Sequence, residues 1–262
     1  MTEAPAGGLA FITGASSGIG QALATRFAAA GYRLALVARR ADEVRRWAQA
    51  AGIAADRCAV YAADVRDIDA IVAAGRECIA ALGVPDVVIA NAGISVGIDT
   101  AVRADLDVMR STFETNVVGV AATFHLFVDA MRQRGSGRLV GIASVAGIRG
   151  MPGHGAYCSS KAAVISYCES LRGELRGQGI RVVTISPGYI DTPLTRGNRY
   201  AMPFLTSASA FADRAFASIA AGTSYRVIPW QMAVVARLLR ALPNAVFDRV
   251  LAGRPRKRRQ GE

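Results

Sequence analysis

The order of short apolar runs and longer helical stretches constrains the fold of this chain more than any other feature. Six runs, rich in β-branched residues and without polar alternation, predict strands at Leu9–Thr13, Arg33–Ala38, Cys58–Ala63, Asp86–Ala90, Arg138–Ala143 and Arg181–Ser186. A further run, Tyr225–Ile228, predicts a seventh strand. Strands that alternate with helices are joined by right-handed crossovers. The sequence therefore predicts an α/β fold, a doubly wound parallel sheet of about seven strands with helices on both faces.

Helices are predicted between these strands and after the last one. They extend from the glycine-rich turn after Thr13 to about Ala30, then over Asp42–Ala50, Asp67–Leu82, Leu106–Arg132 and Tyr157–Gly177, with amphipathic Gln231–Leu242 and Val246–Leu251 at the end. The chain has 262 residues, of which 52% are hydrophobic and 19% charged. This length and composition suit one globular domain over residues 1–262.

The sequence gives no signal for export, membrane insertion or metal binding. Residues 1–5 lack the basic and apolar regions of a signal peptide, and no uncharged apolar run reaches the ~18 residues of a membrane span. The four cysteines, Cys58, Cys78, Cys158 and Cys168, form no Cys-x-x-Cys pair, and the chain has only two histidines. We therefore expect reduced thiols, a cytoplasmic protein and no metal site.

The turn after the first predicted strand reads Thr13-Gly14-Ala15-Ser16-Ser17-Gly18-Ile19-Gly20. Glycines allow a tight turn and close approach of the backbone, and the following helix offers free N–H groups to a phosphate. The spacing is G-x-x-x-G-x-G, which differs from the general G-x-G-x-x-G fingerprint but meets the same physical requirements. Three glycines at the first crossover favour a dinucleotide site over an ordinary turn.

The end of the second predicted strand indicates which dinucleotide is bound. A site for NAD(H) would place an Asp or Glu there, to bind the ribose 2′-hydroxyl. This chain has Ala38-Arg39-Arg40 instead. Two guanidinium groups suit a 2′-phosphate, so we expect NADP(H) to be preferred over NAD(H). The alternative is that both arginines only begin a solvated helix.

Tyr157 and Lys161 lie four residues apart in a predicted helix, so both side chains share one helix face. A fixed positive charge beside a phenol favours the phenolate and makes it usable for proton transfer near neutral pH. The chain has only two lysines against 29 arginines, and Lys161 is one of the two. On its spacing alone the pair could equally be a surface pair.

Together these motifs resemble the short-chain dehydrogenase/reductase family, from about Leu9 to Thr192. The resemblance implies a Rossmann-type domain, and a catalytic tetrad formed by Asn116, Ser144, Tyr157 and Lys161. It also implies a set of cofactor contacts in addition to Arg39 and Arg40: Gly14, Ser16, Ser17, Gly18, Ile19, Gly20, Asp64, Val65, Asn91, Ala92, Gly93, Tyr157, Lys161, Pro187, Gly188, Ile190 and Thr192.

The family resemblance also implies a role for each member of the tetrad. The Tyr157 side chain would act as acid in reduction and as base in oxidation, and Lys161 would lower its pKa and bind the nicotinamide ribose. The Ser144 hydroxyl would hold the substrate oxygen. Asn116 would hold a water that relays protons, and its amide would also satisfy backbone groups at a break in the long helix. Many members that prefer NADP(H) carry a basic residue where this chain has Ser17.

The sequence after Thr192 departs from the family pattern. Residues 195–224 are expected to form a substrate lid, with helix packing on the core as the alternative. Residues 231–262 form a helical extension with a basic tail, Arg254 to Arg259. We favour a dimer contact or core helix with a solvated tail over docking on an anionic membrane. For His154, an exposed loop position is favoured over a place in the substrate pocket.

The leading interpretation is an NADP(H)-dependent oxidoreductase that acts on a carbonyl or secondary alcohol of an apolar substrate. One alternative is a 3-ketoacyl-acyl-carrier-protein reductase, whose acidic partner would suit the net charge of +11. A second alternative is a non-catalytic protein that senses NADP(H). We expect a homodimer or homotetramer and no binding of nucleic acid.

Overall fold

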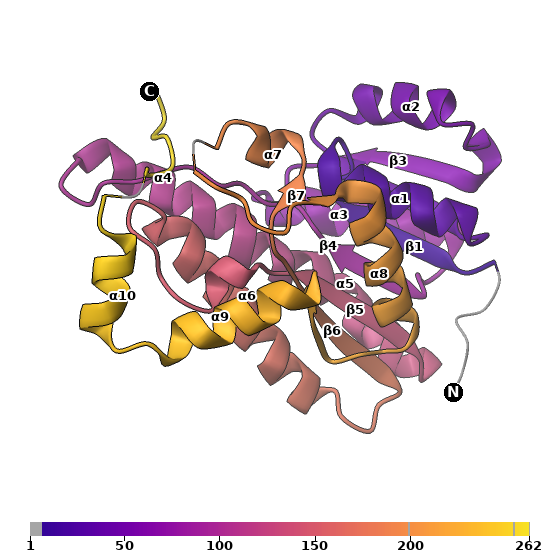
Figure 1. The fold of residues 1–262 in the computed structure, drawn as a ribbon. Helices are drawn as coiled ribbons and strands as arrows, with labels where there is room; N and C mark the ends of the chain where they lie inside the picture. Colours follow the sequence, from indigo (N-terminus) through magenta and orange to yellow (C-terminus); the bar gives the residue numbers. More distant parts are fainter. Residues whose placement is uncertain (1–6, 199, 254, 262) are drawn as a thin grey trace.

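The computed structural model describes residues 7–198, 200–253 and 255–261, and its centre is a parallel sheet of seven strands (Figure 1). The strand order is β3-β2-β1-β4-β5-β6-β9. These strands are β1 (Leu9–Thr13), β2 (Arg33–Ala38), β3 (Cys58–Ala62), β4 (Val87–Ala90), β5 (Gly137–Ile142), β6 (Ile180–Pro187) and β9 (Tyr225–Ile228). The order reverses between β1 and β4, and ligands of such sheets bind at the carboxyl ends beside that reversal.

Helices cover both faces of the sheet because side chains alternate along each strand. In β1, Leu9 and Phe11 enter one core, whereas Ala10 and Ile12 enter the other. The first core is closed by α3 (Ile68–Leu82), α5 (Gly119–Arg134) and α6 (Gly155–Glu174). The second is closed by α1 (Gly18–Ala29), α2 (Ala41–Ala50) and α8 (Ala208–Ala220). The predicted α/β class and doubly wound parallel sheet are confirmed.

The long helix predicted at Leu106–Arg132 is interrupted at Asn116, a member of the predicted tetrad. It consists of α4 (Arg103–Phe113), a π-turn η2 (Glu114–Val118) and α5. Asn116 lies inside the π-turn and is fully buried. Such turns widen one turn of a helix and are frequent at functional sites.

The predicted lid is divided between two roles. Its first part contains α7 (Pro193–Arg196) and the short strand β8 (Thr206–Ser207), which pairs with β7 (Ile190–Asp191). Its second part is α8, where Phe211 is fully buried in the second core and Phe216 packs against that core. For α8, the alternative of helix packing on the core is therefore correct. A role as substrate lid is proposed only for the residues before α8. Arg199 lies outside the described residues.

The C-terminal region folds back over the molecule (Figure 1). Helices α9 (Trp230–Ala241) and α10 (Asn244–Leu251) are followed by residues 255–259, which we name the C-terminal strap. The Gly97 N–H donates to the Arg258 carbonyl at 2.8 Å, and Arg259 Nε lies 2.7 Å from Asp105 Oδ2. Pro255, Arg256 and Arg258 are exposed, as expected of a solvated tail, but the hydrogen bonds of Arg258 and Arg259 fix the strap on the protein surface. Arg254, residues 1–6 and Glu262 lie outside the described residues.

Three short helical turns complete the fold, η1 (Ala55–Arg57), the π-turn η2 and η3 (Val145–Gly147). Among the described residues, no helix combines the length and apolar character needed to cross a bilayer.

Candidate active site

The predicted phosphate-binding turn depends on glycines for conformation and for space. Gly14 has φ +68° and Gly18 has φ +54°, values that side-chain-bearing residues rarely adopt. At Gly20 a Cβ would lie 2.2 Å from the Gly14 carbonyl oxygen, so only glycine lets α1 begin so close to the turn. Ser17 is the N-cap of α1 but its side chain makes no capping hydrogen bond. The first N–H groups of the helix therefore suit a phosphate ligand.

Asn91 connects the end of β4 to this turn. Its side-chain Nδ2 donates to the carbonyl oxygens of Thr13 and Gly14 at 3.0 and 3.2 Å. In return, the Thr13 hydroxyl accepts hydrogen bonds from the backbone N–H groups of Asn91 and Ala92. The predicted cofactor residue Asn91 thus acts here as a clamp that fixes the turn at the strand reversal.

A cavity of about 490 Å³ extends from the turn to Tyr157. All predicted cofactor residues line it except Gly20, which lies behind the turn. Sequence reasoning did not identify eleven further lining residues: Val37, Ala38, Ala63, Arg66, Ile94, Thr115, Ile142, Ala143, Pro193, Leu194 and Thr195. Most of these contribute backbone or apolar surface, which has no motif in the sequence.

The far end of this cavity is basic. Arg39, Arg40 and Arg66 all line it, with Asp64 as the only acidic residue among the described lining. Hydrogen bonds from Arg66 hold the pKa of Asp64 below its usual value, with Nη2 2.7 Å from Oδ2. Arg39 lies 3.9 Å from the same carboxylate, and Arg40 pairs with Glu43 at 2.9 Å. One arginine thus neutralises Asp64, and the exposed side chains of Arg39 and Arg40 suit an anion.

Tyr157 and Ser144 face each other at the inner end of the cavity. Burial raises the pKa of the Tyr157 phenol, and a hydrogen bond with the Ser144 side chain acts against this shift. The Ser144 hydroxyl oxygen also accepts a hydrogen bond from the Ala146 N–H at 3.1 Å, which fixes its position. The Tyr157 pKa is thus raised and not lowered as expected, and the group that acts against the rise is Ser144.

Lys161 is almost fully buried, and burial lowers its pKa to about 8. Its Nζ donates to the Ile142 carbonyl at 2.8 Å and lies 5.9 Å from the centre of the Tyr157 ring. Gly93 leaves room for it, since a Cβ there would lie 3.4 Å from Nζ and 3.3 Å from Asn116 Oδ1. The ammonium is thus held at the cavity of about 490 Å³ with few polar neighbours.

The Asn116 amide is used by the protein itself. Its Oδ1 accepts from the Ile94 N–H at 2.8 Å, and its Nδ2 donates to the Ile94 carbonyl and to Ser160 Oγ at 3.0 Å each. Asn116 therefore joins the π-turn to the loop after β4 and to α6. The structural role predicted for this residue is present.

A second cavity, of about 700 Å³, meets the first one at the tetrad. Ser144, Tyr157, Gly188, Leu194 and Thr195 line both cavities. The wall of the second cavity is largely apolar and comes from the loop after η3 and from α9 and α10. The apolar lining residues from these elements include Ile148, Met151, Met232, Val235, Ala236, Leu239, Phe247 and Leu251.

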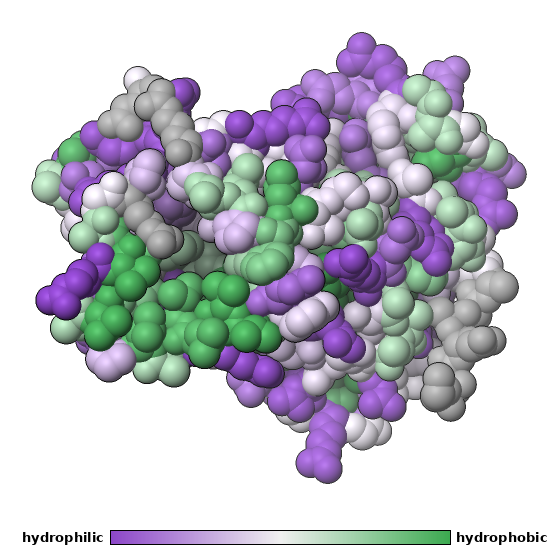
Figure 2. Space-filling model, in the orientation of Figure 1, coloured by the Kyte–Doolittle hydropathy of each residue, from purple (hydrophilic) through white to green (hydrophobic). Residues whose placement is uncertain are grey.

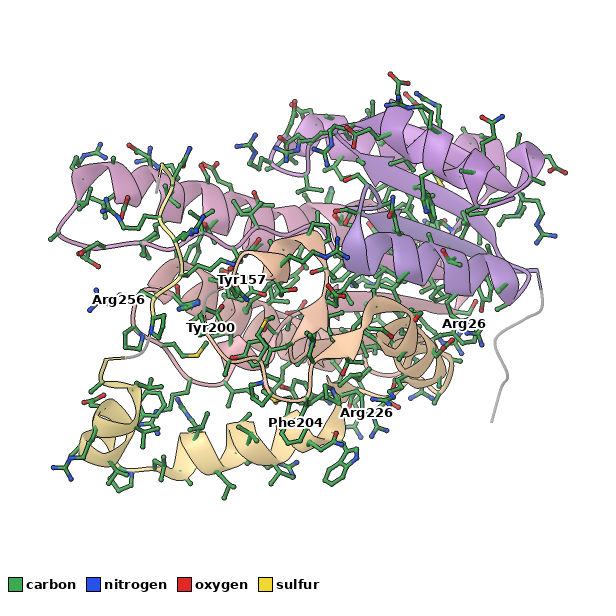
Figure 3. The ribbon with its side chains drawn as sticks, turned by 45° about the horizontal axis from the view of Figure 1, so that its top comes forward. Arg26, Tyr157, Tyr200, Phe204, Arg226 and Arg256 are labelled. Carbon is green, nitrogen blue, oxygen red and sulfur yellow. The ribbon has the colours of Figure 1, made fainter. Side chains whose placement is uncertain are left out.

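His154 lines this second cavity, so the favoured exposed position for it is wrong. Only 8% of the residue is exposed, and its Nε2 lies 3.2 Å from the Tyr200 hydroxyl. Figure 3 shows Tyr200 beside Tyr157 in the middle of the molecule. Burial lowers the pKa of His154, and the charge of Lys257 adds to this shift. Lys257, from the C-terminal strap, is a lining residue that sequence reasoning missed.

Comparisons with known proteins agree with this geometry. Residues 8–202 match the family model described as short chain dehydrogenase. The chain is 40% identical over 242 residues to an uncharacterized oxidoreductase of Myxococcus xanthus, covering 91% of this chain and 94% of the relative. A short-chain dehydrogenase/reductase of Burkholderia phymatum, solved with NAD, superposes with TM-score 0.81 at 25% identity, covering 91% and 94%. The L-sorbose reductase of Gluconobacter frateurii, solved with NADPH and L-sorbose, gives 0.77 at 26% identity, covering 87% and 97%.

Proposed function

The chain belongs to the short-chain dehydrogenase/reductase family, and we propose that it is an NADP(H)-dependent oxidoreductase for a carbonyl or secondary alcohol of an apolar substrate. The observation that carries this proposal is the meeting of two cavities at Ser144 and Tyr157. One cavity has the phosphate-binding turn, and the other has an apolar wall. A reacting carbon can therefore lie between a dinucleotide and the tyrosine.

The nicotinamide, when bound, supplies or accepts the hydride. In reduction, the Tyr157 hydroxyl donates its proton to the substrate oxygen, and in oxidation the same group accepts it. The Ser144 hydroxyl donates a hydrogen bond to the same oxygen and stabilises its developing charge. Lys161 supplies a positive charge 5.9 Å from the Tyr157 ring, which favours the deprotonated phenol at the moment of proton transfer. Asn116 fixes the loop that borders Lys161, and we retain for it a role in holding a relay water.

The basic end of the cofactor cavity supports a preference for NADP(H). Arg39 and Arg40 suit a 2′-phosphate, whereas the charge of Asp64 is already offset by its bonds with Arg66. The test is the ratio of kcat/KM for NADPH to that for NADH. We expect a ratio of about ten or more, because charge-assisted hydrogen bonds contribute ~1.5–3 kcal/mol. A preference for NADH would contradict the proposal.

The activity itself is tested by NADPH oxidation across aldehydes, aliphatic and steroidal ketones and acetoacetyl thioesters. With the best substrate, Tyr157→Phe should lose about 10²–10⁴ in turnover, because the proton donor is removed. Tyr200→Phe is the matched control, since it removes a hydroxyl from the same cavity without touching the tetrad. Equal turnover of Tyr157→Phe and wild type, with chemistry rate-limiting, would remove Tyr157 from its assigned role.

The net charge of +11 favours a second candidate, a 3-ketoacyl-acyl-carrier-protein reductase with an acidic partner. The acetoacetyl thioester arm of the same screen separates the two. A kcat/KM that rises strongly when the thioester is carried by acyl carrier protein, and not by a small thiol, selects this candidate.

A homodimer or homotetramer is supported by an apolar band over α9 and α10 (Figure 2). The outer face of α9 exposes Trp230, Val234 and Leu238, at 68%, 45% and 64%. A band of this kind is typical of an interaction surface. Light scattering of the wild type and of Leu238→Glu tests it, and a monomeric wild type that binds anionic vesicles selects the membrane alternative.

A cytoplasmic location is supported by the four cysteines, all of which are free thiols. Fractionation of the native cells, followed by immunodetection, tests this location. Recovery of the protein outside the cytoplasmic fraction contradicts it.

A further inference from the structure

We propose that the substrate is an apolar chain that carries an anionic group, a carboxylate or a phosphate monoester, and that Lys257 of the C-terminal strap binds this group. The inference rests on the proposed function, in which the cavity of about 700 Å³ takes the substrate. It names the chemical class of that substrate and a specificity-determining residue outside the tetrad.

The charge of the cavity lining is the first support. Among the described residues that line it there are two cations, Arg149 and Lys257, and no Asp or Glu. The rest of the lining is mostly apolar or uncharged, including the α9 and α10 side chains. Solvent screens a half-buried cation such as Lys257 less than a fully exposed one, so it attracts an anion more strongly than a fully exposed lysine does. An entirely neutral apolar substrate would offer this cation no partner of opposite charge.

Lys257 is the better candidate of the two because its ammonium has spare capacity. Its Nζ donates to Asn198 Oδ1 at 2.7 Å and to the Leu194 carbonyl at 3.1 Å. An ammonium has three N–H donors, so one remains for a ligand. Burial lowers the pKa of Lys257, and no carboxylate of the described residues forms an ion pair with it.

Arg149 has a different task. Its guanidinium donates to the carbonyls of Leu239 and Leu242 and to Asn244 Oδ1, and it lies 3.7 Å over the Phe247 ring. These bonds satisfy carbonyls at the end of α9 and connect that end to Asn244 at the start of α10. Arg149 therefore shapes the apolar end of the cavity, whereas Lys257 lies with His154 and Asn198 on its polar side.

This arrangement orients the substrate within the cavity. The two cavities meet at Ser144 and Tyr157, where the carbonyl reacts. Lys257 bonds the carbonyl of Leu194, and Leu194 lines both cavities, so we place the bound anion toward the end of the cavity where the two meet. In this orientation the anionic group lies on the polar side of the cavity, with Lys257, His154 and Asn198, and the apolar chain extends along α9 and α10.

The binding test uses octanoate, octyl phosphate and octanol, measured by calorimetry on the NADPH-saturated protein. We expect one or both anions to bind about tenfold or more tightly than octanol, and the tighter anion identifies the group. Lys257→Gln should remove this difference, because glutamine keeps hydrogen bonding to Asn198 but has no charge. Lys257→Arg should retain most of it. Arg258→Gln is the matched control, since Arg258 is an exposed residue of the same strap and does not line the cavity.

Equal binding of octanol and both anions by the wild type overturns the inference, as does an anion preference that survives Lys257→Gln. Thermal unfolding of each variant shows whether the strap and the fold are intact. Because binding needs no turnover, the two proposals fail separately. If anion binding depends on Lys257 but no carbonyl compound supports NADPH oxidation, the proposed activity is contradicted and the anion site remains supported. Turnover of neutral ketones by a protein that shows no anion preference would support the proposed activity and overturn this inference.

Discussion

The backbone N–H of Gly97 donates a hydrogen bond to the carbonyl of Arg258, with 2.8 Å between nitrogen and oxygen. The two backbones approach so closely that a Cβ on Gly97 would lie 2.1 Å from the Lys257 carbonyl oxygen. Arg259 adds an ion pair with the nearly buried Asp105, and Gly153 packs against the stem of Arg256. The strap is thus fixed at several points beside the cavity of about 700 Å³.

Gly97→Ala should therefore displace the strap. The added methyl group would overlap the Lys257 carbonyl, and the hydrogen bond to Arg258 would be lost. We expect trypsin to cut within residues 256–259 roughly tenfold faster, because local opening costs less free energy. Mass spectrometry of the intact chain gives the rate. Gly150→Ala is the matched control, as a Cβ there meets nothing within 4 Å. Equal cleavage rates would mean that the strap is not held at Gly97.

The strap shows where sequence reasoning reaches its limit. A basic run such as Arg256 to Arg259 is usually solvated, and nothing local marks it as packed. Its partners Gly97 and Asp105 lie more than 150 residues earlier in the chain, so only the fold brings them together. Arg66 also could not be predicted as a lining residue. It follows the predicted Asp64-Val65 pair directly, but only the fold places it with Arg39 in the lining of one cavity.

The sheet and the turn could be predicted because their signals are local. Leu9–Thr13, Arg33–Ala38 and Tyr225–Ile228 have the predicted bounds, since buried strands are continuous apolar runs. The glycines at 14 and 18 have positive φ, as a tight turn into a helix requires. The burial of His154 could not be predicted, because it depends on Tyr200 from a segment that no motif covers.

The preference for the cofactor should change with Arg39→Asp. This substitution removes a guanidinium from the basic end of the cavity and places a carboxylate directly after β2. We expect the NADPH to NADH ratio of kcat/KM to fall about tenfold or more, because a phosphate contact is lost and a ribose acceptor is gained. Arg45→Gln is the control, since Arg45 pairs with Asp42 and lies outside the cavity lining. An unchanged ratio would assign Arg39 to the solvated helix start.

Asn116→Ala should destabilise the protein as well as slow it. The amide satisfies both backbone groups of Ile94, and losing it leaves buried polar groups without partners. We expect a loss of about 1–3 kcal/mol in the free energy of unfolding, measured with urea. Ser160→Ala should cost less, since Asn116 Nδ2 keeps its bond to the Ile94 carbonyl. If Asn116 only held a relay water, turnover would fall while the unfolding free energy stayed the same.

Lys161 should make stability depend on pH in a specific direction. Its pKa is lowered from 10.5 to about 8 in the folded protein. Between pH 8 and 10.5 the unfolded chain therefore binds more protons than the folded one, so this residue makes the unfolding free energy rise with pH. Below pH 8 the full cost of burying the ammonium is present, about 3 kcal/mol for a shift of this size.

Lys161→Met cannot titrate, so its stability relative to wild type reports this contribution up to pH 10, because Cys168, which the Lys161 charge affects, has a pKa of about 11. We expect the variant's relative stability to be highest at pH 7.5 and to decline by about 2–3 kcal/mol at pH 10, measured by urea unfolding. The raised pKa values of Tyr61 and Cys78 act in both proteins and cancel in the difference. Lys257→Met, at the other lysine, should show a smaller decline, because Lys257 is only half-buried. A difference between Lys161→Met and wild type that does not change with pH would mean that the Lys161 ammonium is solvated, and the basis for its action on Tyr157 would then be lost.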